Sequence, residues 1–214
     1  MACLFISRVH SHAYQHLHII INLSRYRRMI FGIKVVRILN ATYTRIMEIQ
    51  NSTIEDLDFI LELYKSATTY QRERYSSHWP VFDREMVMNE ITENRQWKMI
   101  VDGAIVCIWA TTFSDPLIWE ERNADPSVYI HRITTHPNFR GRGFVHTIVA
   151  WSKMYANENG KKFIRMDTVG ENHKLIQHYT DCGFDFLGLF QLTNTVGLPA
   201  HYHHAVVSLF ELKV

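Results

Sequence analysis

The chain has 214 residues, of which 47% are hydrophobic, so it is long enough to enclose the core of a domain. It has no run of about 18 uncharged apolar residues, which argues against a membrane span. Its three cysteines (Cys3, Cys107 and Cys182) are odd in number and lack metal-like spacing, which argues against a disulfide framework or a zinc site and favours a reducing, cytoplasmic compartment.

Charge is distributed unevenly along the chain. Seven of the 23 basic residues and none of the 21 acidic residues lie in residues 1–46, so this segment carries +7 and residues 47–214 carry −5. Met47 opens a stretch typical of the start of a compact domain. We therefore expect residues 1–46 to be a basic extension outside the fold, either a non-native start or a loose tail, and residues 47–214 to form the domain. A transit peptide or a membrane-surface segment is the alternative for this extension.

Residues 46–113 predict a strand, two helices and then two strands. A short strand is expected at 46–50, and then a helix capped by Ser52 or Thr53, with apolar positions on one face as far as Tyr64. A second helix is expected from about 83 through 91. Asp102-Gly103 predicts a tight hairpin turn between strands at 96–101 and 104–113. The loop that follows contains Asp115, Glu120, Glu121 and Asp125, and it either attracts a cationic amine or is simply solvated.

Residues 127–160 predict a strand, a glycine-rich turn and a helix. Branched and aromatic residues make 127–135 a strand, and apolar residues recur at helical spacing from Phe144 until Asn159 and Gly160 end the helix. Gly141 and Gly143 allow an anion to approach the unpaired N–H groups of the first helical turn. This arrangement predicts a phosphate site, to which the adjacent arginines add positive charge.

The rest of the chain predicts a strand at 162–167, a helix at 172–182 and strands at 184–192 and 202–212. Antiparallel strands first, then a strand-helix-strand unit and a final hairpin, indicate an α+β domain with a mixed sheet. Asn172, Leu175, Tyr179 and Gly183 fall on one side of the last helix, with the glycine as its C-terminal cap.

Two motifs resemble those of the GNAT N-acetyltransferase family. Arg140-x-x-Gly143-x-Val145 is similar to the family's acetyl-CoA motif, with Val145 where Gly or Ala is usual. The Asn172-to-Gly183 spacing, followed by Phe184, is similar to its second signature, with Leu175 where Ala is usual. The resemblance covers about residues 47–214. It implies the GNAT fold: a mixed, mostly antiparallel central sheet of about six to seven strands flanked by about four helices.

The resemblance also implies an acyltransferase that uses acetyl-CoA as cosubstrate. The acetyl group would pass by direct attack to a primary amine, on a small molecule or a peptide, that the sequence does not identify. The pantetheine arm would pair with backbone near Ile133, Thr134 and Thr135, and Asn172 would contact CoA. The pyrophosphate would meet the N–H groups of Arg140, Gly141, Arg142, Gly143, Phe144 and Val145.

Three residues are candidates for the proton transfers that acyl transfer to an amine requires. Tyr179 matches the family's tyrosine that protonates the departing thiolate. Asp167 matches the position of a base glutamate in some family members and is one carbon shorter, so a water relay is more plausible than direct contact. His131 is the alternative base, because its ordinary pKa of about 6.5 suits proton abstraction near neutral pH.

Other functions receive less support from the sequence. His201 and His203 are expected on one face of a strand with His204 on the other, and no carboxylate or cysteine stands at ligand spacing from them, so no metal site is expected. The −5 charge of residues 47–214 argues against nucleic-acid binding, and no membrane partner is expected. A GNAT-fold module that binds or senses acyl-CoA without turnover is the alternative function. The C-terminal strand leaves a homodimer possible.

Overall fold

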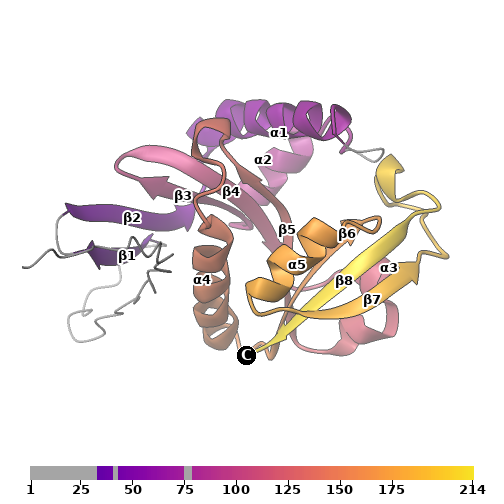
Figure 1. Ribbon diagram of the computed structural model, residues 1–214. Helices are drawn as coiled ribbons and strands as arrows, with labels where there is room; N and C mark the ends of the chain where they lie inside the picture. The colour runs from indigo at the N-terminus through magenta and orange to yellow at the C-terminus, as the bar shows by residue number, and fades with distance from the viewer. Residues whose placement is uncertain (1–32, 41–42, 75–78) are drawn as a thin grey trace, which may run out of the picture.

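One sheet runs through the computed structural model, which describes residues 33–40, 43–74 and 79–214 (Figure 1). Its eight strands lie in the order β1-β2-β3-β4-β5-β6-β8-β7. The strands are β1 (Ile33–Asn40), β2 (Tyr43–Asn51), β3 (Gln96–Val101), β4 (Ala104–Thr112), β5 (Ser127–Thr135), β6 (Phe163–Val169), β7 (Asp185–Gln191) and β8 (Val206–Lys213). Every neighbouring pair is antiparallel except β5 and β6, so the sheet is mixed.

Five α-helices pack on this sheet among the described residues: α1 (Leu57–Arg72), α2 (Arg84–Thr92), α3 (Pro116–Trp119), α4 (Phe144–Glu158) and α5 (His173–Asp181). Successive residues of a strand point to opposite faces, and β4 shows the result. Cys107 is buried in the core beneath α4 and α5, and its neighbour Ile108 is buried against α1 and α2. Both faces of the central sheet are therefore covered. None of the described helices has the length and apolar character needed to cross a membrane.

The sequence-based elements agree closely with the structure. The α+β class and the mixed sheet are confirmed, and seven of the strands lie in residues 43–214. The hairpin at Asp102-Gly103 joins β3 to β4, with both residues at positive φ as a tight turn requires. The last strand begins at Val206 rather than at residue 202, because Ala200–Tyr202 forms a short 3-10 turn.

Two features differ from the sequence expectation. The loop expected after β4 contains α3 and a 3-10 turn (Glu120–Ala124), whose apolar residues Ile118 and Trp119 are buried. The eighth strand, β1, falls in the segment expected to lie outside the fold, and it pairs with β2 along eight residues. Residues 1–32 lie outside the described residues, so the domain boundary near residue 47 stays a prediction.

Candidate functional site

β5 and β6 separate near the centre of the sheet. Their parallel pairing extends only from Ser127–Phe163 to Tyr129–Arg165. Beyond this point β6 pairs with β8 as far as Val169, and β5 pairs with β4 as far as Thr135. From residue 130 onward, the edge of β5 that faces β6 therefore has no strand partner among the described residues. This free edge carries the predicted pantetheine-binding residues Ile133, Thr134 and Thr135. A ligand with amide groups can pair there as a further strand would.

A β-bulge directs this free edge. The β4–β5 register shifts between Ile108 and Ala110, and Arg132 on the bulged strand has a φ of +53°. The Arg132 guanidinium lies 2.5 Å from both carboxylate oxygens of Glu90 on α2, and its Nε donates to the Tyr64 hydroxyl at 3.4 Å. These contacts hold an unfavourable backbone conformation and fix the course of β5 beyond it.

The glycine turn follows the free edge and opens into α4. Gly141 and Gly143 have φ of +76° and +71°, and Gly143 is the N-cap of α4 without a side-chain cap hydrogen bond. The first N–H groups of α4 have no partner within the helix, so the turn presents donors and a positive dipole end. The predicted anion site is therefore placed at the end of the free edge of β5.

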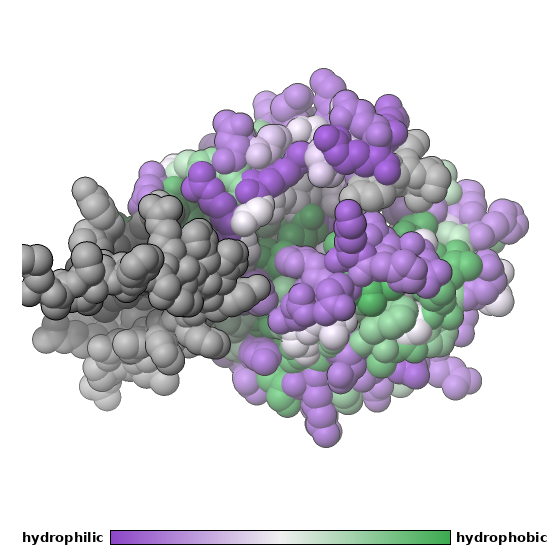
Figure 2. All heavy atoms as spheres, in the orientation of Figure 1, coloured by the Kyte–Doolittle hydropathy of each residue, from purple (hydrophilic) through white to green (hydrophobic). Residues whose placement is uncertain are grey.

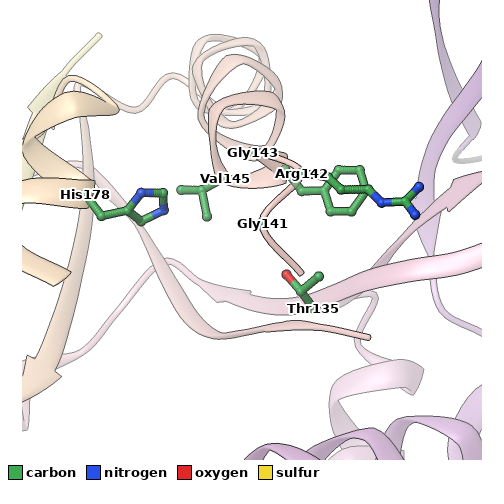
Figure 3. A pocket seen from close by; sticks show the side chains of 7 residues that line it. Thr135, Gly141, Arg142, Gly143, Val145 and His178 are labelled. Carbon is green, nitrogen blue, oxygen red and sulfur yellow. The ribbon is translucent and has the colours of Figure 1, made fainter. Parts of the chain in front are cut away.

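A cavity of about 120 Å³ lies at this turn (Figure 3). Figure 3 shows Thr135 at the end of β5, His178 facing Val145 from α5, and the Arg142 guanidinium directed away from His178. The Arg142 guanidinium lies over the Phe139 ring and the Arg140 guanidinium over the Tyr70 ring. Of these two arginines, only Arg142 lines the cavity. The lining residues are Thr135, Gly141, Arg142, Gly143, Phe144, Val145 and His178.

Helix α5 carries the second predicted motif. The Asn172 side-chain oxygen accepts a hydrogen bond from the Leu175 N–H at 3.1 Å and so caps the helix. Tyr179 is buried against Phe184 and Phe210, and burial raises the pKa of its hydroxyl well above the ordinary value. Tyr179 therefore keeps its proton at neutral pH. The sequence reasoning did not single out His178, whose pKa is lowered by burial and by His146.

Asp115, His131 and Asp167 meet where β5 and β6 diverge. One ligand atom from each lies within 4.8 Å of the others, close enough to hold a cation. The distance from His131 Nε2 to Asp115 Oδ2 is 3.7 Å, and the Tyr202 hydroxyl donates to Asp167 Oδ2 at 2.8 Å. The structure thus brings together both predicted base candidates and adds two residues, Asp115 and Tyr202, which the sequence reasoning did not place there.

Burial shifts the pKa values of all three groups toward their neutral forms. Burial and the neighbouring Asp167 charge raise the pKa of Asp115 to about 7. Burial raises the pKa of Asp167 to about 6, although the hydrogen bond from Tyr202 opposes this shift. Burial, together with Arg132 and Arg95, lowers the pKa of His131 to about 3. At neutral pH His131 is therefore neutral, and the carboxyl groups titrate near the pH of the cell.

The structure refines one interpretation of a polar segment and corrects another. The acidic loop was expected either to attract a cationic amine or to be solvated; the structure partly buries Asp115 beside His131, whereas Glu120 and Glu121 are exposed. His201 and His203 were placed on one face of a strand, but they lie in and just after the 3-10 turn that precedes β8. The Tyr202 hydroxyl in this turn connects the segment to the site through its hydrogen bond to Asp167.

Residues 58–184 match the acetyltransferase (GNAT) family, so the chain belongs to this family. The chain is 22% identical over 142 residues to the "Uncharacterized N-acetyltransferase YesJ" of Bacillus subtilis (strain 168), an alignment covering 63% of this chain and 79% of that protein.

The fold is similar to those of solved GNAT structures. An acetyltransferase of the GNAT family from Listeria monocytogenes aligns with a TM-score of 0.65 at 19% identity, over 83% of this chain and 99% of that chain. The putative acetyltransferase yncA from Salmonella typhimurium, solved with acetyl-CoA, aligns with a TM-score of 0.57 at 14% identity, over 78% of this chain and 93% of that chain.

Members of the GNAT family use acetyl-CoA as the acetyl donor, and the residues present here fit that molecule. The free edge of β5 suits the two amide groups of pantetheine, and the glycine turn suits the pyrophosphate. A Cβ added to Gly141 would meet no atom within 4 Å, so the space above the turn is open to a ligand.

Proposed function

We propose that this protein is an N-acetyltransferase that transfers the acetyl group of acetyl-CoA to a primary amine by direct attack. The observation that carries the proposal is the free edge of β5. It has an anion-binding turn at one end and titratable groups, Asp167 and His131, at the other. Acetyl-CoA held along this edge would have its phosphates at the N–H donors of the turn and its thioester beside the groups able to move protons.

Asp167 is the better of the two base candidates. His131 has a pKa of about 3, so its neutral imidazole is too weak a base to deprotonate an ammonium ion efficiently. Asp167, with a pKa of about 6, is deprotonated at neutral pH and is a stronger base than an ordinary carboxylate. His131 then serves as a neutral polar wall of the acceptor site.

Tyr179 is proposed as the acid that protonates the CoA thiolate. It is protonated at neutral pH, and it lies near enough to Asp167 for that charge to raise its pKa further. Because its pKa is high, the proton it gives must be replaced as it leaves. The nitrogen of the tetrahedral intermediate, which has to lose a proton to form the amide, is the source.

Two finer points belong to the same proposal. We place the reaction in the cytoplasm because the two cysteines within the described residues, Cys107 and Cys182, are buried free thiols, as a reducing compartment favours. The expectation that the C-terminal strand pairs across a homodimer was wrong, because β8 lies inside the sheet between β6 and β7. We propose the edge strand β7 as the homodimer contact instead. Figure 2 shows hydrophobic side chains over this part of the surface.

Calorimetric titration tests the donor assignment. Acetyl-CoA and CoA are titrated separately into the full chain, and free thiol is then measured as members of an amine library are added to the acetyl-CoA complex. We expect both ligands to bind and at least one amine to release thiol. Binding without thiol release from any amine would favour the alternative, a module that senses acyl-CoA. If neither ligand binds, the assignment is wrong.

A further inference from the structure

We propose that Asp115 and Asp167 act as one proton-accepting pair, and that the acceptor enters between them and His131 as an alkylammonium ion. This inference rests on the proposed function and deepens it in two ways. It assigns a role to Asp115, and it restricts the acceptor to amines basic enough to be protonated when they bind.

The first support is position. Asp115 follows β4, His131 lies on β5 and Asp167 on β6, so three neighbouring strands deliver the three side chains to one point. Their ligand atoms lie within 4.8 Å of one another, and Asp115 Oδ2 is buried without a hydrogen-bond partner. A buried carboxylate oxygen normally has a donor, so this oxygen is left for a group that the chain does not supply.

The second support is charge. Among the described residues, no lysine or arginine lies within 4 Å of either carboxylate, and the nearby Arg132 is paired with Glu90 instead. Two carboxylates without a cationic partner are costly in a partly buried site, which favours a pair that holds a proton or a cation. An alkylammonium ion satisfies this need with three N–H donors and one positive charge.

The third support is that the loop bearing Asp115 is held rigidly. Arg165 is 1% exposed, and it bonds to Asp125 and to the Arg122 carbonyl in this loop and to Glu211 on β8. The Asp115 N–H donates to the Asn123 side chain at 2.6 Å. The fold thus fixes a carboxylate whose Oδ2 has no hydrogen-bond partner in the described part of the chain, as a preorganised proton acceptor requires.

The groups that face the pair determine its pH dependence. Tyr202 donates to Asp167 from the turn before β8, and His131 adjoins Asp115 from β5. Arg132 acts on Tyr202 and His131, Arg95 acts on His131, and Tyr179 on α5 interacts with Asp167. Of these, only the two carboxyl groups change charge near neutral pH.

Proton transfer precedes attack in the proposed step. The ammonium ion gives one proton to the pair, which goes from one shared proton to two, and the free amine attacks the thioester carbonyl. The C–S bond then breaks, and the thiolate takes a proton from Tyr179, which recovers one from the nitrogen. The products are the amide and CoA thiol, and the pair releases its extra proton to water.

Carbon-13 NMR of the full chain labelled at the aspartate carboxyl carbons tests the pair directly and needs no acceptor. Asp115→Asn and Asp167→Asn assign the two resonances. We expect both carboxyls of the wild type to titrate above pH 5, and the midpoint of each to fall by at least about one pH unit when the other is replaced. If either midpoint stays unchanged by the other substitution, the pair is disproved.

Kinetics with an amine that the library identifies provide the second arm. Asp115→Asn should lower kcat at pH 7 by about tenfold or more and shift the optimum to higher pH, where the amine loses its proton unaided. Glu121→Gln, which removes an exposed carboxylate from the same loop, is the matched control and should leave the profile unchanged. An unaltered profile in Asp115→Asn overturns the inference, and thiol release by that variant shows that the proposed function nevertheless holds.

Discussion

Tyr179 packs in the core, and it is also the residue that we propose as the general acid. Its ring packs against Phe184 and Phe210, and a phenylalanine fills the same space. Tyr179→Phe should therefore keep the fold and the affinity for acetyl-CoA, while kcat falls by about a hundredfold through loss of the general acid. Calorimetry and steady-state kinetics measure the two quantities. A variant with unchanged kcat would exclude Tyr179 from the proton transfer.

Asp115 should make the protein less stable as pH rises. Its pKa is about 7 in the folded chain against an ordinary 3.8, so the folded state binds more protons between these values. The stabilisation is present below about pH 4 and is lost as pH rises through 7. At pH 8 the Asp115→Asn variant should therefore have a free energy of unfolding about 2 kcal/mol higher than the wild type, and a higher unfolding temperature. Near pH 4 the two proteins should differ little. Thermal unfolding at both pH values checks this.

The contribution of His131 to stability has the opposite pH dependence to that of Asp115. Its pKa of about 3 lies below the ordinary 6.5, so its contribution is present above about pH 6.5 and is lost as pH falls. If Asp115→Asn were less stable than the wild type at pH 8, the ionised Asp115 carboxylate would be stabilising the fold. The role of Asp115 as a proton acceptor in an unfavourable environment would then be wrong.

The glycine turn before α4 is the element that we propose to bind the pyrophosphate through its backbone. Alanine at Gly143, where φ is +71°, should cost about 1 kcal/mol and displace the first N–H groups of α4. We expect Gly143→Ala to bind acetyl-CoA about tenfold more weakly by calorimetry. Gly160, at φ +63° beyond the other end of α4, provides the control. Gly160→Ala should lose similar stability with unchanged affinity, and equal affinity in both variants would remove the turn from the site.

The bulge in β5 depends on an ion pair that links two elements. The Glu90 side chain is only 8% exposed, and its removal would leave the buried Arg132 charge uncompensated. Glu90→Gln should lower the free energy of unfolding by about 3 kcal/mol or more. Glu93→Gln, which breaks an exposed pair with Arg95, should cost less than about 1 kcal/mol. Urea unfolding compares them, and equal losses would contradict the role given to the bulge.

Local signals in the sequence were sufficient for most elements. Asp102-Gly103 located the β3–β4 hairpin, and the run from Val128 to Thr135 followed by the glycines located β5 and α4. Strand β1 and the short helix α3 lacked such signals. β1 is stabilised by its pairing with β2, and α3 by the core cluster that Ile118 and Trp119 join, and neither contact can be read from the local sequence.

The candidate site was only half predictable for a related reason. The motif residues from Arg140 to Val145 and Tyr179 stand at fixed spacings within single elements, so a resemblance could identify them. Asp115 and Tyr202 reach the site from segments distant in sequence, through the Arg165-anchored loop and the turn before β8. The pairing of β6 with β8, which no local pattern specifies, brings these segments together.

At the scale of the whole molecule, the sheet ends at β7, an edge strand with exposed hydrophobic side chains. Phe186, Leu189 and Phe190 are each more than a third exposed. If two copies pair through this edge, as we propose, the protein should behave as a dimer in analytical ultracentrifugation, and the double substitution Leu189→Lys and Phe190→Lys should yield a monomer. A wild-type monomer would rule out this interface.

The measurement that tests the account most directly is formation of an acetylated amine. The full chain is incubated with acetyl-CoA and the amine library, and the products are identified by mass spectrometry, with Tyr179→Phe and Asp167→Asn run in parallel. We predict that a protonated alkylamine gains one acetyl group as CoA thiol appears in equal amount, and that both variants make far less product. Acetyl-CoA bound without any acetylated amine would contradict the assignment of this protein as an N-acetyltransferase.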